Sequence, residues 1–333
     1  SIAKAAYSKL YAAMGDAFTS ADVSSGFTQP ALPSSTTWAS VAYGDGLFVA
    51  ISSGGLSSVS SDKGASWQVG GSLPAGTWKY LAYGAGLFVA VATGPVAYCA
   101  TSTDGTTWTQ RTMPSSNWSA VAYGAGRFVA MGNNASAYSL DGISWVTGGS
   151  IGFASSSFQM AYGAGRFVAN QANGSPNTAA YSTLDGVTWI ASTLPLSTAW
   201  ASVAYGNGFF LMVSNASGGA ALAVSWDGTN WLSSGAAGSS QTSLVAFAAG
   251  KFFFVPSSGS TASVMDYPLK FSSLTMPSHG FTRSAAFGGG VAVFLLFGTT
   301  ALTARINLWG GVNFNLPNLT PLDPEKSAFV RAL

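Results

Sequence analysis

Charged side chains are scarce in this chain. Only 7% of its 333 residues are Asp, Glu, Lys or Arg, whereas roughly 25% is typical of soluble domains. The 13 Lys and Arg residues are scattered and leave a net charge of +2. Nucleic-acid binding requires clustered positive charge to neutralise phosphates. We therefore expect a surface of Ser, Thr, Asn and Gly, and no nucleic-acid partner.

Residues that bind metals or transfer protons are also few. The chain has one histidine, His279, one glutamate, Glu325, and one cysteine, Cys99. This leaves no Cys and His set for a zinc site, and no glycine-rich stretch leads into the Lys-Ser/Thr of a phosphate loop. A single cysteine excludes an intramolecular disulfide. We expect Cys99 to be a buried strand residue, and we expect no metal and no other cofactor.

Long apolar runs are missing as well. The mean hydropathy is +0.32, but the apolar residues come in short bursts, the longest around 291–297. A membrane-spanning helix needs about 20 consecutive apolar residues. We therefore expect no transmembrane segment, no membrane insertion and no signal peptide.

What the chain does have is a repeat of about 40 residues, a period typical of propeller blades. Its first half reads W-x-x-V-A-Y-G-x-G-x-F-V-A and its second half reads S-x-D-G-x-x-W. The first half is anchored by an aromatic residue, which in successive copies is Tyr43, Tyr83, Tyr123, Tyr162, Tyr205, Phe247 and Phe287. The second half is anchored by Trp67, Trp108, Trp145, Trp189 and Trp231, with Phe271 as a degenerate copy.

One copy of the repeat predicts four strands. Apolar residues alternate from Trp38 to Tyr43, a Gly-Asp-Gly turn follows, and Leu47–Ile51 begins a buried strand. A third strand, a tight turn containing Asp and Gly, and a fourth strand opening with Trp67 complete the copy. An isolated blade cannot bury both faces, so the copies stack around an axis. We predict an all-β, seven-bladed propeller of four-stranded antiparallel blades over residues 26–308.

The closure of the ring is also predicted. Several fourth strands have the form aromatic-x-x-x-x-Leu/Met-Pro, as in Trp108–Pro114, and residues 27–33 have the same form but precede the first copy. We expect this segment to be the outer strand of the last blade, which would remove the free sheet edge of an open ring. Pro30 suits such an outer edge.

The second half of the repeat resembles the Asp-box of sialidases and many other propellers. The motif fits at Ser60-Ser-Asp62-Lys-Gly64-Ala-Ser-Trp67, and one copy, Ser182/Asp185/Gly186/Trp189, carries an extra residue before its aspartate. The resemblance implies that the box aspartates satisfy the amides of their own turns and are structural. These aspartates are Asp62, Asp104, Asp141, Asp185 and Asp227.

The two ends of the chain resemble the halves of a phage tail collar domain. Residues 1–19 read as an amphipathic helix with Leu10, Tyr11 and Met14 on one face, and residues 314–319 read Phe-Asn-Leu-Pro-Asn-Leu. The resemblance implies a small collar-like domain with one N-terminal helix, made of residues 1–25 and 309–333, with the propeller inserted between them. It further implies a homotrimeric fibre protein that is made in the host cytoplasm, is located in the virion tail and contacts other tail proteins.

The residues argue against a glycosidase, so we expect no enzyme. A glycosidase needs two carboxylates that converge on one sugar. Beyond the box aspartates, the propeller has only Asp45, in a turn, and Asp266, in a degenerate box. We therefore expect no catalytic residue.

Binding is the remaining class of function. Strand order places the second-to-third loops and the fourth-to-first connections of every blade on one face, which also carries uncharged polar loops. The candidate ligand-binding residues on it are Trp38, Trp78, Trp118, Trp200, Asn170, Asn173, Asn177 and Asn215. Flat aromatics beside amides suit a surface polysaccharide, although these tryptophans alternatively pack between blades. We expect a non-enzymatic receptor-binding protein for a bacterial surface glycan; the alternatives are a glycan depolymerase and a structural spacer or decoration protein.

Overall fold

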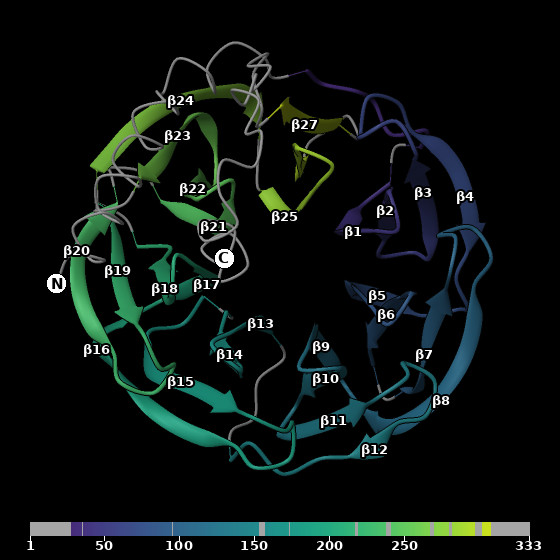
Figure 1. Ribbon diagram of the computed structural model, residues 1–333, viewed down its shortest axis with the longest axis horizontal. Helices are drawn as coiled ribbons and strands as arrows, with labels where there is room; N and C mark the ends of the chain where they lie inside the picture. Colours follow the sequence, from purple (N-terminus) through teal and green to yellow (C-terminus); the bar gives the residue numbers. More distant parts are fainter. Residues whose placement is uncertain are drawn as a thin grey trace, which may run out of the picture.

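The chain folds as a ring of antiparallel sheets (Figure 1). The computed structural model describes residues 28–34, 36–94, 96–152, 157–172, 174–216, 219–237, 241–266, 270–279, 282–296 and 302–307. Every regular element in these residues is a strand, so the expected absence of helices from the propeller holds there. The expected collar halves, 1–25 and 309–333, lie outside the described residues.

Six sheets have four strands each, paired in sequence order, and we number them as blades 1 to 6. Blades 1 to 3 consist of β1 (Trp38–Gly44), β2 (Leu47–Ser52), β3 (Leu56–Ser60) and β4 (Gln68–Ser72); β5 (Thr77–Gly84), β6 (Leu87–Thr93), β7 (Val96–Ser102) and β8 (Thr109–Ser116); and β9 (Trp118–Gly124), β10 (Arg127–Gly132), β11 (Ala135–Ser139) and β12 (Val146–Thr147). Blades 4 to 6 consist of β13 (Phe158–Gly163), β14 (Arg166–Gln171), β15 (Asn177–Thr183) and β16 (Ile190–Thr198); β17 (Trp200–Gly206), β18 (Phe209–Ser214), β19 (Ala220–Ser225) and β20 (Leu232–Ala237); and β21 (Thr242–Ala248), β22 (Lys251–Pro256), β23 (Gly259–Asp266) and β24 (Lys270–His279).

The expectation of seven four-stranded blades is wrong for the last one. The structure has six such blades, and the last sheet has three strands, β25 (Thr282–Gly288), β26 (Val291–Leu296) and β27 (Leu302–Asn307). The segment expected to complete it is not a continuous strand, because only Thr28 and Ala31 form isolated bridges. Pro30 lies between those bridges and has no N–H to donate to a ladder.

A tight turn joins the first two strands of each sheet. In the copy that joins β5 to β6, Ala85 and Gly86 have φ values of 48° and 76°, as in the type I′ turns that connect hairpin strands. The glycine before the turn is needed for another reason. A Cβ on Gly84 would lie 2.0 Å from Cγ of Tyr123, so the ring of the next blade's repeat tyrosine lies directly on the glycine.

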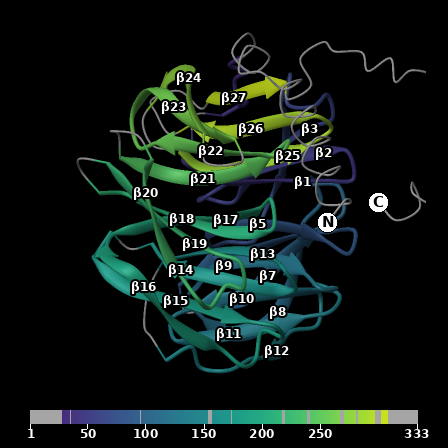
Figure 2. The same cartoon turned by 60° about the vertical axis from the view of Figure 1, so that its left-hand side comes forward.

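This contact repeats around the ring and also closes it. The same clash, at 2.0 to 2.1 Å, would occur between Gly44 and Tyr83, Gly124 and Tyr162, Gly163 and Tyr205, and Gly206 and Phe247. At the seam, a Cβ on Gly288 of the last sheet would lie 1.9 Å from Cδ1 of Tyr43 in blade 1. Strands β25 and β1 accordingly lie side by side in both views (Figures 1 and 2).

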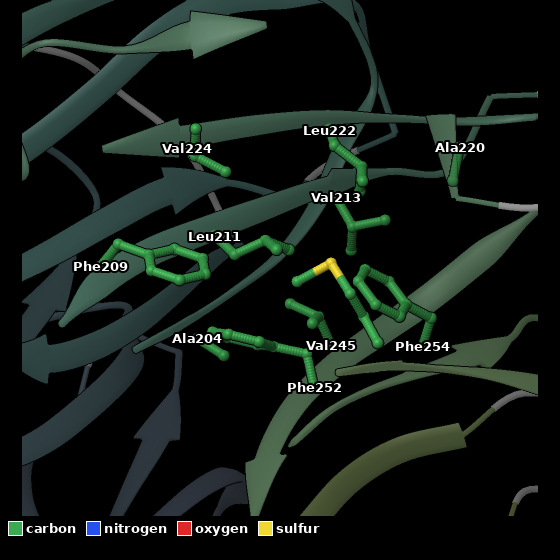
Figure 3. Packing of buried hydrophobic residues seen from close by; sticks show 11 residues of the cluster. Ala204, Phe209, Leu211, Val213, Ala220, Leu222, Val224, Val245, Phe252 and Phe254 are labelled. Atoms are coloured by element: carbon green, nitrogen blue, oxygen red, sulfur yellow. The ribbon is translucent and has the colours of Figure 1, made fainter. Parts of the chain in front are cut away.

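Apolar side chains fill the space between neighbouring sheets. Between blades 5 and 6, Leu211, Val213 and Leu222 of one sheet meet Val245 and Phe254 of the other, and all are buried (Figure 3). Each core is therefore shared by two blades, which matches the expectation that a blade cannot bury both faces alone.

The residues before β1 take part in the last of these cores. Leu32 is buried with Trp38 of blade 1 and with Val291, Val293 and Leu295 of β26. In Figure 1 these first described residues, drawn in dark purple, pass on the outer side of β27. The seam is also bridged near the axis, where the amide of Val41 donates to Oγ of Ser284 at 3.2 Å.

Candidate functional site

The two connections of each blade come together on one face, here called the loop face. The residue just after the second strand donates its amide to a carbonyl just before the first strand. This tie joins Ser53 to Thr37, Asn133 to Asn117, Ala172 to Ser157, Asn215 to Ala199, and Ser257 to Gln241, at 2.8 to 3.3 Å. The expected common face for these loops is therefore present, and its loops start from fixed positions.

The four tryptophans expected on this face do not present their rings to solvent. Trp78, Trp118 and Trp200 are at most 1% exposed, and Trp38 is 5% exposed. Each indole donates to the carbonyl four residues earlier, on Ser34, Pro74, Pro114 or Leu196. They occupy the cores between blades. The packing alternative is the one that the structure shows, because a buried ring cannot stack on a ligand.

The candidate asparagines have different environments. Asn170 is fully buried at the end of β14, and Asn173 lies outside the described residues. Asn177 is half-buried, and its amide is used within its own loop, donating to the carbonyl of Ser175 and accepting from the amide of Ala179. Asn215 is also half-buried, and its Oδ1 has no hydrogen-bond partner. Only Asn177 and Asn215 are thus placed near the surface of the loop face.

Blade 4 departs most from the repeat. Asn170 pairs with Gln159 across β13 and β14, at a position where blades 1, 3 and 5 have Ile51, Met131 and Val213. The Nε2 of Gln159 donates to the hydroxyl of Tyr80 at 2.7 Å, so a side chain of blade 2 reaches blade 4 past blade 3. This pair was not among the residues predicted from the sequence. Alignment of the first strands position by position would have identified the pair. At this position Tyr80 and Gln159 replace the serine found in other copies, which is Ser40, Ser202 or Ser284.

The Asp-box turns lie on the opposite face, here called the box face. In blade 2 the amides of Thr106 and Thr107 donate to Oδ1 of Asp104 at 2.8 and 2.7 Å. Ser102 donates its hydroxyl to the same oxygen and accepts from the amide of Gly105. The other four boxes have the same arrangement around Asp62, Asp141, Asp185 and Asp227.

These hydrogen bonds keep the box carboxylates ionised. The backbone amide of Thr107 is the main cause that lowers the pKa of Asp104, and that of Ser144 does the same for the pKa of Asp141. At Asp62 desolvation acts in the opposite direction, but hydrogen bonds from Ser66, Ser60 and Ala65 outweigh it and lower the pKa to about 2. A carboxyl group with such a pKa cannot donate a proton near neutral pH. The geometry fits the expected structural role.

One box was aligned incorrectly from the sequence. Ser182 was expected to begin the box of Asp185, with one extra residue between them. Instead Thr183 donates to Oδ1 of Asp185 at 2.9 Å and accepts from the amide of Gly186. The hydroxyl of Ser182 accepts from Nη1 of Arg166. Threonine and serine carry the same hydroxyl, so the box of blade 4 has the same spacing as that of blade 2 once threonine is allowed.

Each box turn packs on the blade before it. A Cβ on Gly105 would lie 2.5 Å from Cγ2 of Val49 in blade 1, and one on Gly228 would lie 2.6 Å from Cγ2 of Val168 in blade 4. The carbonyl of Gly105 also accepts from the hydroxyl of Ser57 in blade 1 at 2.8 Å. The boxes therefore fasten neighbouring blades together.

Beyond the ionised box aspartates, most polar groups of the described residues are uncharged donors and acceptors. No cluster of His, Cys, Asp or Glu that could hold a metal ion occurs among them. Cys99 is buried, and burial raises its thiol pKa to about 12, which matches the expected inert strand residue. This part of the chain contains no helix with the length and apolar character of a membrane span.

The comparisons with known proteins identify the fold. No family model matches the chain, and no curated protein matches its sequence. Virginiamycin B lyase from Staphylococcus aureus is similar in structure, with a TM-score of 0.72 and 11% identity over 85% of this chain and 99% of the lyase. YCF48 bound to D1 peptide has a TM-score of 0.65 and 14% identity over 84% of this chain and 94% of YCF48. YCF48 from Cyanidioschyzon merolae has a TM-score of 0.66 and 13% identity over 85% and 98%. At these identities the likeness is one of fold, a β-propeller of four-stranded blades.

Proposed function

We propose that this chain is a non-enzymatic receptor-binding protein of a phage tail fibre or tail tip, and that its loop face binds a bacterial surface glycan. The observation that carries the binding role is the fixed, common face on which loops of unequal composition are gathered. Loops held by a rigid scaffold are where binding residues concentrate. Their Asn, Ser and Gly residues offer neutral hydrogen-bonding groups, which suit the hydroxyls of a saccharide.

The placement on a phage tail rests on the terminal sequences. The helix pattern in residues 1–19 and the Phe314–Leu319 segment resemble the collar domain, which in fibres belongs to homotrimers. The protein would then reside in the virion, bound to other tail proteins. The buried tryptophans are left out of the binding surface, which centres on the loops around Asn177 and Asn215.

A seventh blade completed by the N-terminal segment is part of this proposal. Leu32 is buried with Trp38, as Leu73, Met113 and Leu194 are buried with Trp78, Trp118 and Trp200 in the cores of complete blades. The indole of Trp38 also donates to Ser34 as the indole of Trp78 donates to Pro74. We infer that residues 28–33, although they form no continuous strand, cover the outer side of the last sheet where a fourth strand would lie, so that the two ends of the propeller meet on one side, as an insertion into a collar loop requires.

Retention on isolated polysaccharides tests the proposal. The full chain is mixed with a panel of capsular polysaccharides and lipopolysaccharides from different bacteria, and saturable binding and new reducing ends are both measured. Binding without new reducing ends supports a receptor-binding protein. New reducing ends would instead establish the depolymerase, and the absence of both signals across the panel would favour the spacer.

A loop variant locates the binding surface. Replacement of residues 172–176 by a Gly-Ser linker of equal length should weaken retention at least about tenfold while the melting temperature stays within a few degrees, since surface loops contribute little to stability. The control is Ala125→Asn in an exposed turn of the box face, where blade 5 has Asn207. Full retention by the loop variant would place the receptor site elsewhere.

A further inference from the structure

Large apolar side chains are exposed at two equivalent positions of the box turns in blades 3, 4 and 5. The residue before the box aspartate is 58 to 63% exposed, and the residue after the box tryptophan is 45 to 59% exposed. We call these six side chains the apolar arc: Leu140, Leu184 and Trp226 at the first position, and Val146, Ile190 and Leu232 at the second. The outer strands β12, β16 and β20 follow the lower and left parts of the ring in Figure 1.

The Asp-box itself does not require these apolar residues. At the first position blades 1 and 2 have Ser61 and Thr103, and at the second they have Gln68 and Thr109. Their turns nonetheless make the same hydrogen bonds. The exposed apolar residues are therefore a property of one side of the ring and are not required for the hydrogen bonds of the turn.

The blades that carry the arc are fastened to one another, since a Cβ on Gly228 in the box turn of blade 5 would lie 2.6 Å from Cγ2 of Val168 in blade 4. A Cβ on Gly149, next to the outer strand of blade 3, would lie 2.0 Å from the carbonyl oxygen of Val187 in the box turn of blade 4. Nη1 of Arg127 in blade 3 donates to the backbone carbonyl of Asp185 at 3.1 Å, which fastens the same two blades. Ile143 and Val187, in the box turns of blades 3 and 4, are 40% and 38% exposed and add to the exposed apolar surface of these turns.

The exposed area is large for a monomer. The exposed fractions of the six residues correspond to about 600 Å² in total, at the upper end of the roughly 300 to 600 Å² of the largest patch on a typical monomer and approaching the ~800 Å² that each partner buries in a standard interface. We propose that the apolar arc is the contact surface between two copies of this chain, paired arc to arc.

A second copy fits the arc better than another region of the chain's own surface. The other exposed large hydrophobics among the described residues, Leu56, Val69, Leu196 and Phe271, belong to blades 1, 4 and 6 and form no second strip of this kind. Among the described residues, therefore, only the arc of another copy offers a matching apolar surface. Pairing of identical patches is two-fold, and for the homotrimer proposed above it would join copies that belong to two different trimers. The arc lies on the box face, so this pairing leaves both loop faces open.

Sedimentation of the full chain tests the pairing. The test variant is Leu140→Thr, Leu184→Thr and Trp226→Thr, which installs the residue that blade 2 has at Thr103. The wild-type chain should form a species of twice the mass of the variant at the same concentration, and the variant should associate at least about 100-fold more weakly. Leu196→Thr, at an exposed leucine outside the arc, is the control and should behave as wild type. Equal masses for wild type and variant would overturn the proposal.

Spin labels locate the contact. Cys99 is buried, so a cysteine introduced by Leu184→Cys or by Ser61→Cys is the only accessible thiol. Arc-to-arc pairing predicts a short distance between copies for labels at Leu184→Cys and a much longer one at Ser61→Cys. Similar distances at both positions would overturn the pairing. A monomeric wild type whose Leu184→Cys label is shielded would mean that residues 1–27 or 308–333 of the same copy cover the arc, and this too would overturn it.

Discussion

The absence of a Cβ atom at one glycine allows neighbouring blades to lie close together. The repeat aromatic of a blade rests on a glycine of the blade before it. Blade 6 has Ala248 in place of that glycine, and the next sheet has Ala292 instead of phenylalanine opposite Phe287. Phe287 contacts Phe294 at 6.0 Å, whereas the repeat aromatics of the other sheets contact their facing phenylalanine at 4.7 to 4.8 Å. The glycine and the facing phenylalanine are therefore replaced at the same place in the ring.

The first prediction follows from this contact. Gly84→Ala should lower the free energy of unfolding by about 3 kcal/mol, because the new Cβ overlaps the Tyr123 ring and two packed sheets must move apart. Chemical denaturation measures the effect. Gly54→Ala is the control, since a Cβ there meets no atom within 4 Å, and should change stability by less than about 0.5 kcal/mol. A neutral Gly84→Ala would show that the blades are loosely packed at this point.

A second residue-scale prediction concerns pH. The pKa of Asp104 is lower in the folded chain than the value of about 3.9 in an unfolded one. Below about pH 4 the unfolded state therefore binds more protons, so stability is fully present above that pH and is lost as the pH falls. Asp104→Asn keeps the acceptor oxygen but not the charge. It should cost ~1 kcal/mol at pH 7, because the group is open to solvent, and should flatten the decline of stability below pH 4. An unchanged decline would mean that the box carboxylates contribute no net stabilisation.

At the scale of elements, the repeat made most of the strands predictable. The hairpin with its Gly-x-Gly turn and the box turn with its Asp-Gly both depend on short-range backbone geometry, so residues a few positions apart contain the information. The candidate site was harder to predict from the sequence. Whether Trp200 faces a ligand or a neighbouring blade depends on residues from two sheets, and the pattern W-x-x-V-A-Y is the same in either case. The exposure of Leu184 and Trp226 could have been predicted by aligning the repeats, because blade 2 has the polar residue Thr103 at the same position.

The seam gives the element-scale prediction. Leu32→Ala should lower the free energy of unfolding by about 2 to 5 kcal/mol, because the side chain is buried between blade 1 and β26. Leu196→Ala, at a leucine that is 42% exposed, serves as the control. If both variants unfold at the same denaturant concentration as wild type, residues 28–34 are not part of the core.

For the whole molecule, the same seam has a consequence for biosynthesis. The first described residues to leave the ribosome, with Leu32 and Tyr43 among them, find their partners on β26 and Gly288, which are made last. Contacts so distant in sequence form slowly, and an unpaired sheet side invites association with other chains in the meantime. Each new blade can pack only on the blade before it, whereas blade 1 must wait until β26 has been made. Closure of the ring is therefore the last step of its assembly, and the low charge of the chain gives the waiting edges little electrostatic protection from one another.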